Sequence, residues 1–333
     1  MSRLTTSGQP LPGGMLAAVS ADMPAITNSR VVRLADVSQL VRPRIALMVL
    51  VTVFAAIWLT AQPVGMSGIS WLAVAGVLVG TALVAASSSI ANQILERDSD
   101  RLMARTASRP VAAGRLSVSR AWLVTVLSLL VGAAVVWGFG GPAAMLAAVA
   151  TWVLYVAVYT PLKQRTPLNT AVGAVAGGLP VAIGWLAADG PARLAAGDMV
   201  GGLAVAALGT VLYLWQFPHF MAIAWLYRRQ YAAAGLQMLT VVDPSGLRAA
   251  GQALAAALAM VPVSLVLAVP SASTRLFLTA AVASIVYAGA SAWFAFRRDD
   301  RSARLLLLTS LGVLLVLMSA AVTFGGPAVL GQT

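Results

Sequence analysis

Long apolar stretches, separated by short segments rich in arginine, glycine and proline, dominate this chain of 333 residues. A helix that crosses the roughly 30 Å hydrocarbon core of a membrane needs about 20 mostly apolar residues. Nine stretches meet that requirement, and we expect each to be a transmembrane helix: residues 44–62, 70–96, 118–138, 142–160, 169–188, 199–226, 248–269, 274–296 and 303–323. The sequence therefore predicts an all-α integral membrane protein with nine transmembrane helices.

The composition indicates lipid, rather than water, as the solvent of most of the surface. Only 10% of the residues are charged, whereas soluble domains carry roughly 25%. The formal net charge of +12 does not indicate nucleic acid binding, because the basic residues sit in short loops between apolar stretches. The chain has no cysteine, which excludes disulfides and thiolate metal sites.

The basic residues also predict how the helices are oriented. Nine helices would place all but two of the 22 Lys and Arg residues on one side, the exceptions being Arg193 and Arg275. Because cytoplasmic loops carry an excess of basic residues, we expect this side and the N-terminus to be cytoplasmic, in a bacterial inner membrane. We expect three parts: a mobile cytoplasmic tail at residues 1–40, one transmembrane domain at 41–325 and a short tail at 326–333.

Three of the ten acidic residues, Glu96, Asp98 and Asp100, close the second apolar stretch. The spacing i, i+4, i+8 places Asn92, Glu96 and Asp100 on one helix face, one turn apart. Such oxygen ligands suit Mg²⁺, which binds one or two carboxylates together with substrate phosphate oxygens. These residues could instead be charged groups that end a helix as it leaves the membrane. Asp98 points elsewhere, and we expect it to be solvated or paired with arginine.

Basic side chains follow the acidic residues, both in the same loop and in later cytoplasmic segments. Guanidinium groups bind phosphate oxygens in bidentate pairs, so the pattern is compatible with a site for a metal-bound diphosphate. The alternative is that these residues only orient the helices. The residues concerned are Arg105, Arg109, Lys163, Arg165 and Arg228.

The only histidine, His219, directly follows Pro218 in the sixth apolar stretch. Ionisable side chains inside a membrane bundle usually face its interior and mark function. A structural role, in which the histidine stabilises the kink made by Pro218, fits the sequence equally well. The sequence leaves this choice open.

These segments resemble a known family. The run from Asn92 to Asp100, which continues to Arg109-Pro110, resembles the first motif of the UbiA superfamily of intramembrane prenyltransferases. Residues 42–44, 159–169 and 215–220 are similar to corresponding segments of the haem O synthases, the protohaem IX farnesyltransferases within that superfamily. The similarity covers about residues 38–245.

The resemblance implies a nine-helix bundle that transfers the farnesyl group of farnesyl diphosphate to a vinyl group of haem B, with water addition and release of diphosphate. Its implied partners are these two substrates, the lipid bilayer, and a downstream haem A synthase or terminal oxidase assembly. It also implies three groups of site residues: Asn92, Glu96 and Asp100 for Mg²⁺; Arg105, Arg109, Lys163, Arg165 and Arg228 for the diphosphate; and His219 for haem iron or for acid–base work.

One segment departs from the family pattern. An acidic pair usually precedes the tyrosine that follows the sixth stretch, whereas this chain has Arg229-Gln230 before Tyr231. We expect a single metal site at Asn92, Glu96 and Asp100, with the charge of Arg229 in place of a second cation.

Two other functions remain open from the sequence. The first is a UbiA-type prenyltransferase that acts on a quinone or other ring acceptor. The second is a transporter or channel. The polar residues gather at one membrane face instead of forming a path through the membrane, and this pattern favours an enzyme.

Overall fold

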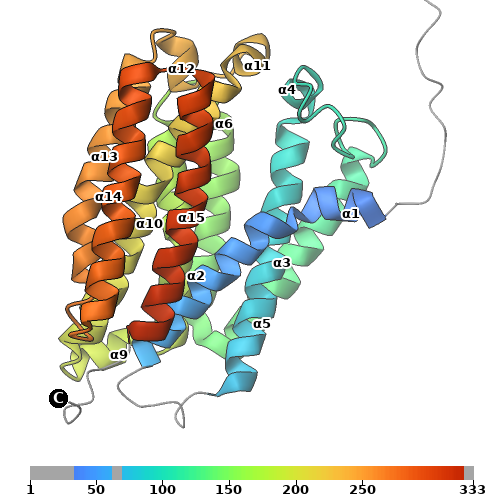
Figure 1. Ribbon diagram of the computed structural model, residues 1–333. Coiled ribbons are helices and arrows are strands. Elements are labelled where there is room, and N and C mark those ends of the chain that lie inside the picture. Colours follow the sequence, from blue (N-terminus) through green and yellow to red (C-terminus); the bar gives the residue numbers. More distant parts are fainter. Residues whose placement is uncertain (1–33, 62–69, 326–333) are drawn as a thin grey trace, which may run out of the picture.

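The protein is described by a computed structural model that covers residues 34–61 and 70–325. These residues form helices and connecting loops, and they contain no strand (Figure 1). Eight segments within them are long and apolar enough to cross a membrane. The segments are α2 (Pro43–Ala61), α3 (Trp71–Leu95), the run Val118–Leu162, the run Asn169–Ala187, α10 (Met199–Leu226), α13 (Leu247–Val266), α14 (Thr274–Arg297) and α15 (Asp300–Phe324).

The run Val118–Leu162 contains the third and fourth stretches expected from the sequence, joined as α5 (Val118–Val153), the π-helix η3 (Leu154–Tyr159) and α6 (Thr160–Leu162). Its backbone leaves the helical conformation at Gly141, with φ 80° and ψ 172°, directly before Pro142. This Gly-Pro pair interrupts the run near its middle.

Two hydrogen bonds show that the chain reverses direction at this interruption. The Ser87 hydroxyl of α3 donates to the carbonyl oxygen of Thr125 at 2.8 Å and accepts from Trp152 Nε1 at 2.9 Å. Thr125 and Trp152 lie on opposite sides of Gly141 and yet reach the same level of α3. The run of 45 residues thus holds two of the nine expected stretches, one on each side of the turn at Gly141.

A short helix, α1 (Leu34–Val41), precedes α2 and packs on α3. The Gln93 amide of α3 donates to the carbonyl oxygen of Leu40 at 3.2 Å. The part of the expected mobile tail that the structure describes is therefore a docked helix. Residues 1–33, and the expected C-terminal tail at 326–333, lie outside the described residues.

Helix α10 occupies a central position, since it packs against α2, α13, α15 and α7 (Asn169–Gly178). Its Met221 is fully buried, together with Met260 of α13, Tyr287 of α14 and Leu306 of α15. In Figure 1, α10, α13, α14 and α15 form one side of the bundle, while α3 and α5 lie on the other. A side chain on α10 is consequently held by several neighbouring helices.

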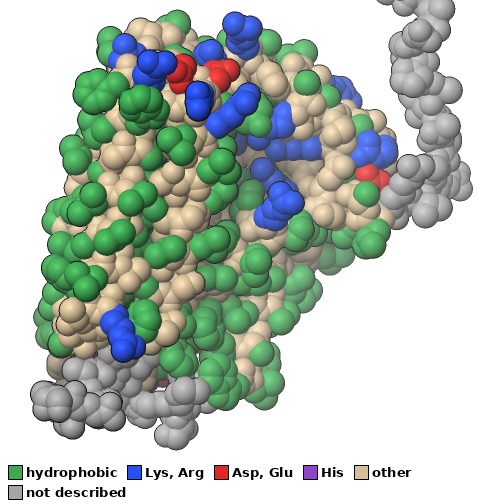
Figure 2. Space-filling view, viewed as in Figure 1, with side chains coloured by type: hydrophobic (Ala, Val, Ile, Leu, Met, Phe, Trp, Pro, Cys, Tyr) green, Lys and Arg blue, Asp and Glu red, His purple; other side chains and the backbone are tan. Residues whose placement is uncertain are grey.

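The short helices gather mainly at one end of the bundle (Figure 1). Figure 2 shows basic side chains concentrated at this end and around a hollow on the face that it draws. The opposite end carries α9 (Gly190–Ala195) with Arg193. The elements at the basic end are α4 (Arg97–Arg101), α6, α11 (Arg228–Ala233) and α12 (Leu239–Val242).

Candidate functional site

The end of α3 brings the expected acidic residues together, although the helix is interrupted there. Glu96 has φ −92° and ψ 7°, and it separates α3 from α4. The amide of Glu96 still donates to the carbonyl oxygen of Asn92, and the amide of Asp100 donates to that of Glu96. The helical spacing therefore continues across the break. All three side chains belong to residues that are no more than 7% exposed.

Two basic side chains lie against these carboxylates. Lys163 Nζ lies 2.7 Å from Glu96 Oε1. Arg109 Nη1 lies 2.6 Å from Asp100 Oδ2 and 3.7 Å from Glu96 Oε2. Because charges buried without partners cost several kcal/mol, the four residues stabilise one another. We call Glu96, Asp100, Arg109 and Lys163 the ionic cluster.

The pKa values of the two buried carboxyl groups shift in opposite directions, downward for Glu96 and upward for Asp100. Burial by itself would raise the pKa of Glu96, but Lys163 and Arg109 outweigh burial and hold this pKa below its ordinary value. Burial raises the pKa of Asp100 above its ordinary value, and Arg109 offsets only part of the effect. Burial would lower the pKa of Lys163, yet Glu96 and nearby tyrosines raise it. The negative charge of Asp100 is therefore held in an unfavourable environment.

Two oxygen atoms beside the cluster are available to a cation. Asp100 Oδ1 is buried and has no hydrogen-bond partner among the described residues. The Asn92 amide nitrogen donates to Thr160 Oγ1 at 3.1 Å, whereas no described side chain or backbone group hydrogen-bonds to the Asn92 amide oxygen. A buried carboxylate oxygen without a partner is costly, and a bound cation would satisfy it. The donor set of two carboxylates and one amide therefore fits Mg²⁺.

These three side chains cannot fill the coordination of Mg²⁺ by themselves, so the remaining oxygens would come from water or a ligand. Within the described ranges, no group of three or more histidine, aspartate or glutamate side chains is placed to hold a metal ion. Mg²⁺ commonly uses one or two carboxylates and completes its coordination with water and substrate phosphates. The arrangement is thus compatible with a metal that binds together with a phosphate-bearing molecule.

The π-helix η3 ends beside the cluster and fixes Asn92. Thr160 Oγ1 donates to the carbonyl oxygen of Tyr155 at 2.9 Å and accepts from Asn92. Lys163 Nζ lies 4.4 Å from the centre of the Tyr159 ring. Short π-helical turns often occur at functional sites. Sequence reasoning gave Thr160 no role of its own, because its contact with Asn92 depends on this π-helical turn.

Arg105 supplies a cation beside aromatic rings. Its guanidinium lies 4.6 Å from the centre of the Tyr227 ring, and Nη2 donates to the Tyr231 hydroxyl at 3.3 Å. No carboxylate among residues 34–61 and 70–325 pairs with it. Gln230 Oε1 accepts from the backbone amide of Arg105 at 3.3 Å, so the segment that departs from the family pattern positions this loop.

The other basic residues that we expected in or beside the site form no ion pair with the ionic cluster. Arg228 pairs with Asp300 at 2.8 Å and lies over the ring of Trp225 at 4.4 Å. Arg165 and Arg229 are exposed, and neither forms an ion pair with a carboxylate that the structure describes. The structure therefore pairs Arg109 and Lys163 with the acidic residues, whereas none of these three arginines pairs with Glu96 or Asp100.

Asp98 confirms the expectation for the acidic residue outside the cluster. Its side chain is 76% exposed and pairs with Arg97 at 3.0 Å and with Arg101 at 3.4 Å. Asp98 is thus exposed to solvent, whereas Asp100, two residues later, is fully buried.

His219 lies in a second polar group, between α10 and α15. Its Nδ1 lies 2.8 Å from Ser310 Oγ, and its ring stacks on Trp215 with a centroid distance of 4.8 Å. His219 precedes Tyr227 by eight residues, which corresponds to about 12 Å along a helix. Sequence reasoning missed Ser310. Its only signal was a serine inside a leucine-rich stretch, and the fold alone brings it to His219.

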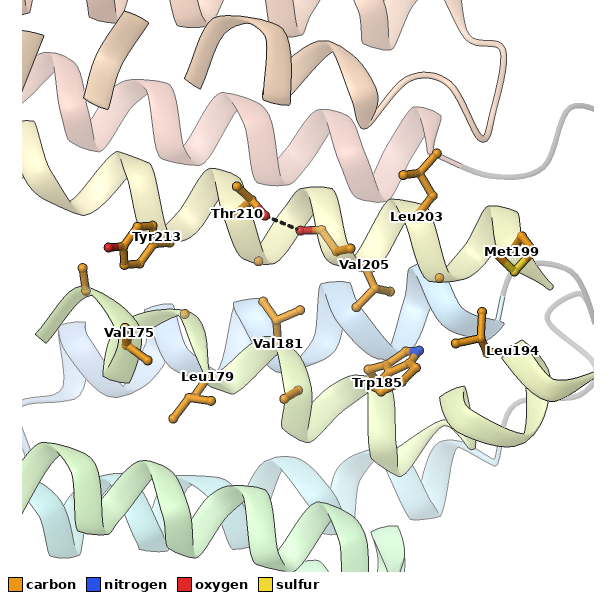
Figure 3. Close-up of a pocket in the computed structure, with 16 residues that line it drawn as sticks. Val175, Leu179, Val181, Trp185, Leu194, Met199, Leu203, Val205, Thr210 and Tyr213 are labelled. Carbon is orange, nitrogen blue, oxygen red and sulfur yellow. Dashed lines mark hydrogen bonds between the residues drawn. The ribbon is translucent and has the colours of Figure 1, made fainter. Parts of the chain in front are cut away.

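A groove of about 700 Å³ lies between α10 and the consecutive helices α7, α8 (Pro180–Ala187) and α9 (Figure 3). Val181, Trp185, Leu203 and Val205 line it, and none of its lining residues is acidic or basic. The groove therefore suits an apolar chain or a lipid.

Comparisons with known proteins agree with this geometry. Residues 49–315 match the model of the UbiA prenyltransferase family. The chain is 41% identical over 284 residues to a protein of Rhodopirellula baltica named protoheme IX farnesyltransferase, covering 83% of this chain and 95% of that relative. A protein of the same name from Solibacter usitatus is 37% identical over 74% of this chain and 83% of the relative.

A solved structure shares the fold. The structure of a UbiA homologue from Archaeoglobus fulgidus bound to DMAPP and Mg²⁺ matches with a TM-score of 0.64 and 15% identity. The match covers 86% of this chain and 97% of that one. At this low identity the similarity bears on the architecture of the helices alone.

Proposed function

We propose that this chain, which belongs to the UbiA prenyltransferase family, converts haem B to haem O by transferring the farnesyl group of farnesyl diphosphate to a haem vinyl group. The observation that carries the choice of haem is the 41% identity to a protoheme IX farnesyltransferase across 95% of that relative. The buried ionic cluster is the feature of the fold that suits the diphosphate.

We assign the metal-binding role to Asn92, Glu96 and Asp100. The partnerless Asp100 Oδ1 and the available amide oxygen of Asn92 support this assignment. Bound Mg²⁺ would neutralise the charge that develops on the leaving diphosphate. Asp100 would also gain, because a cation at Oδ1 offsets the unfavourable burial of its charge.

The basic residues of the site would hold the diphosphate itself. Arg109 and Lys163 are already buried beside the acidic residues, where they can exchange a carboxylate contact for a phosphate oxygen. Arg105 adds a guanidinium that no described carboxylate neutralises, and the Tyr227 ring and Tyr231 hydroxyl orient it. Arg228 is left out of this assignment, because it pairs with Asp300.

These residues can promote the reaction by stabilising charge where it develops. The bond between C1 of the farnesyl group and the diphosphate oxygen breaks, and the electron pair leaves with the diphosphate. The vinyl double bond supplies the electrons for the new carbon–carbon bond to C1. The resulting carbocation beside the porphyrin takes up water and loses a proton, which gives the hydroxyethylfarnesyl group.

The location of the site follows from the distribution of charge. The ionic cluster lies beside α4 and α6 (Figure 1), at the end of the bundle where basic side chains gather (Figure 2). We place this end on the cytoplasmic side of a bacterial inner membrane. Farnesyl diphosphate would then arrive from the cytoplasm while haem B enters from the bilayer. The product would pass to a haem A synthase or a terminal oxidase assembly.

An acceptor competition tests this function against the quinone-ring alternative. Purified chain is incubated with Mg²⁺, isotopically labelled farnesyl diphosphate and an equal mixture of haem B and a hydroxybenzoate acceptor. We expect label on the porphyrin, and no label when EDTA replaces Mg²⁺. Label on the hydroxybenzoate alone would overturn the assignment of haem.

A further inference from the structure

The hydroxyl of Thr160 determines how the Asn92 amide is turned. Thr160 Oγ1 lies 2.9 Å from the carbonyl oxygen of Tyr155 and 3.1 Å from the amide nitrogen of Asn92. A hydroxyl has one hydrogen, and a carbonyl oxygen has none to offer, so the Thr160 hydrogen lies between Oγ1 and Tyr155. Towards Asn92 the hydroxyl only accepts, and only the amide nitrogen can donate to it.

The carboxylate of Glu96 favours the same orientation of the amide. Burial would raise the pKa of Glu96, but Lys163 lowers it, and a side-chain hydrogen bond from Asn92 adds to this effect. An ionised carboxylate only accepts hydrogen bonds, so this bond also comes from the amide nitrogen. The nitrogen is thus used on both sides, while the amide oxygen has no partner among the residues that the structure describes.

The π-helical turn holds the Thr160 hydroxyl in place. The backbone N–H of Thr160 donates to the carbonyl oxygen of Tyr155, five residues earlier, and the hydroxyl donates to the same atom. In an α-helix a threonine hydroxyl bonds to a carbonyl three or four residues earlier. Asn92 and Thr160 are only 1% and 4% exposed, so bulk water does not compete for their hydrogen bond. The turn therefore presents a buried acceptor to the Asn92 amide.

We infer that Thr160 is a positioning residue for the metal site, because its hydroxyl selects the orientation of Asn92 in which the amide oxygen is free for Mg²⁺. This role rests on the proposed function, since it takes Asn92 as a metal ligand. A reversed amide would place its oxygen against a hydroxyl whose hydrogen is already used. It would also turn an NH₂ group, which has no acceptor site, towards the cation. Thr160 would act through Asn92 without touching the metal or the diphosphate.

The Mg²⁺ dependence of farnesyl diphosphate binding tests this role without turnover. Purified protein is titrated with Mg²⁺ at a fixed concentration of labelled farnesyl diphosphate, in the absence of haem B. Thr160→Val keeps the shape of the side chain and removes the hydroxyl. We expect half-maximal binding at a Mg²⁺ concentration at least about 10-fold higher than in the wild type, as loss of the partner of a metal ligand typically causes. Thr160→Ser keeps the hydroxyl and should retain the wild-type dependence.

Thr151→Val is the matched control. Its hydroxyl donates to the carbonyl oxygen of Ala147 at 2.8 Å in the same helical run. Thr151 lies nine residues before Thr160, which corresponds to roughly 13 Å along a helix. This variant loses a comparable hydrogen bond outside the metal site, and we expect it to bind farnesyl diphosphate with the wild-type Mg²⁺ dependence.

Asn92→Asp separates positioning from a general disturbance of the π-helix. A carboxylate offers an oxygen to Mg²⁺ in either orientation, so Thr160→Val should cause no further change in this background. An equal shift in both backgrounds would overturn the positioning role, and so would wild-type Mg²⁺ dependence in Thr160→Val. Thr160→Ala takes the place of Thr160→Val if the valine variant does not fold.

Failure of the proposed function would give a different result. Wild-type protein that binds farnesyl diphosphate equally well with Mg²⁺ and with EDTA would overturn the metal role assigned to Asn92, and the role of Thr160 with it. Label on the hydroxybenzoate alone in the acceptor competition would overturn haem as the acceptor. The Mg²⁺ dependence of the Thr160 variants would still support the positioning role in that case.

Discussion

At the scale of single residues, the ionic cluster contains one satisfied carboxylate, Glu96, and one carboxylate with an unsatisfied oxygen, Asp100. Glu96 and Lys163 form a mutually stabilised pair, whereas Asp100 retains a partnerless oxygen and an unfavourable charge. Strained or incompletely satisfied groups are common where a protein binds a ligand, because the ligand relieves the cost. We therefore regard Asp100 as the residue that gains most from Mg²⁺.

The pair between Glu96 and Lys163 predicts a non-additive effect on stability. Glu96→Gln leaves Lys163 buried without an anion at 2.7 Å, and Lys163→Met leaves Glu96 without its closest cation. Removing one partner of a buried pair typically costs about 3–5 kcal/mol. We expect each single variant to unfold at a lower temperature in detergent and the double variant to recover part of the loss, with all three inactive. Additive losses in the double variant would contradict direct pairing.

The contrast between Asp98 and Asp100 gives a matched pair of substitutions. Asp100→Asn removes a charge beside the partnerless oxygen and should abolish Mg²⁺-dependent binding of farnesyl diphosphate. Asp98→Asn alters an exposed side chain and should leave both binding and turnover unchanged. Calorimetric titration of each purified variant with farnesyl diphosphate and Mg²⁺ measures the difference. Equal losses in the two variants would mean that the metal role is assigned to the wrong carboxylate.

At the scale of elements, Gly141 makes one helical run behave as two antiparallel halves. Its φ of 80° with ψ of 172° belongs to a region that only glycine adopts readily. A Cβ at this position would meet no atom within 4 Å, so a substitution tests the backbone alone. The turn lets both Thr125 and Trp152 reach Ser87 of α3.

Gly141→Ala should therefore lower stability by about 1–3 kcal/mol through backbone strain. Gly138→Ala is the matched control, because Gly138 lies in the same run and a Cβ there also meets no atom within 4 Å. This control should unfold at the wild-type temperature or slightly above it, since alanine favours helix over glycine. Thermal unfolding in one detergent compares the two variants. Equal unfolding temperatures would argue against a strained turn at Gly141.

The elements divide into those that the sequence predicts and those that it does not. The bounds of α2, α13 and α14 lie within three residues of the expected stretches, because hydropathy is a local property of the chain. The π-helix at Leu154–Tyr159 has no comparable local signal. The docking of α1 on α3 also lay outside sequence reasoning, since it depends on a contact between distant segments.

The same division applies to the candidate site. The spacing of Asn92, Glu96 and Asp100 predicts their convergence, because all three lie on one short segment. Arg109 pairs with Asp100 from only nine residues further along the chain, so this contact is also close to local in sequence. The contact of His219 with Ser310 joins residues 91 positions apart, and only the packing of α10 against α15 creates it. A distant contact also overturns one prediction from the sequence. Arg228 was expected to bind the diphosphate, but it pairs with Asp300 on α15.

At the scale of the whole molecule, the distribution of charge predicts the orientation in the membrane. Basic side chains gather at the end that holds the ionic cluster (Figure 2), and α9 with Arg193 lies at the other end. By the positive-inside rule we propose that the ionic cluster lies on the cytoplasmic side. The chain contains no cysteine, so single cysteine substitutions can report on this orientation without interference.

Cysteine labelling in whole cells tests the orientation. Asp98→Cys lies on the exposed surface of the basic end, and Ala196→Cys lies in the exposed loop after α9. A membrane-impermeant maleimide should label Ala196→Cys in intact cells with a permeabilised outer membrane, and should label Asp98→Cys only after lysis. The reverse pattern would place the ionic cluster on the outer side and contradict the proposed entry of farnesyl diphosphate from the cytoplasm.

The central claim is that this bundle couples cleavage of farnesyl diphosphate to alkylation of haem B. The most direct measurement incubates purified protein with Mg²⁺, farnesyl diphosphate and haem B, and quantifies both released diphosphate and porphyrin mass in the same sample. We predict one diphosphate for each porphyrin that gains one farnesyl group and one hydroxyl, with neither product in Glu96→Gln. Diphosphate release with an unaltered porphyrin mass, or product formation by Glu96→Gln, would contradict the account.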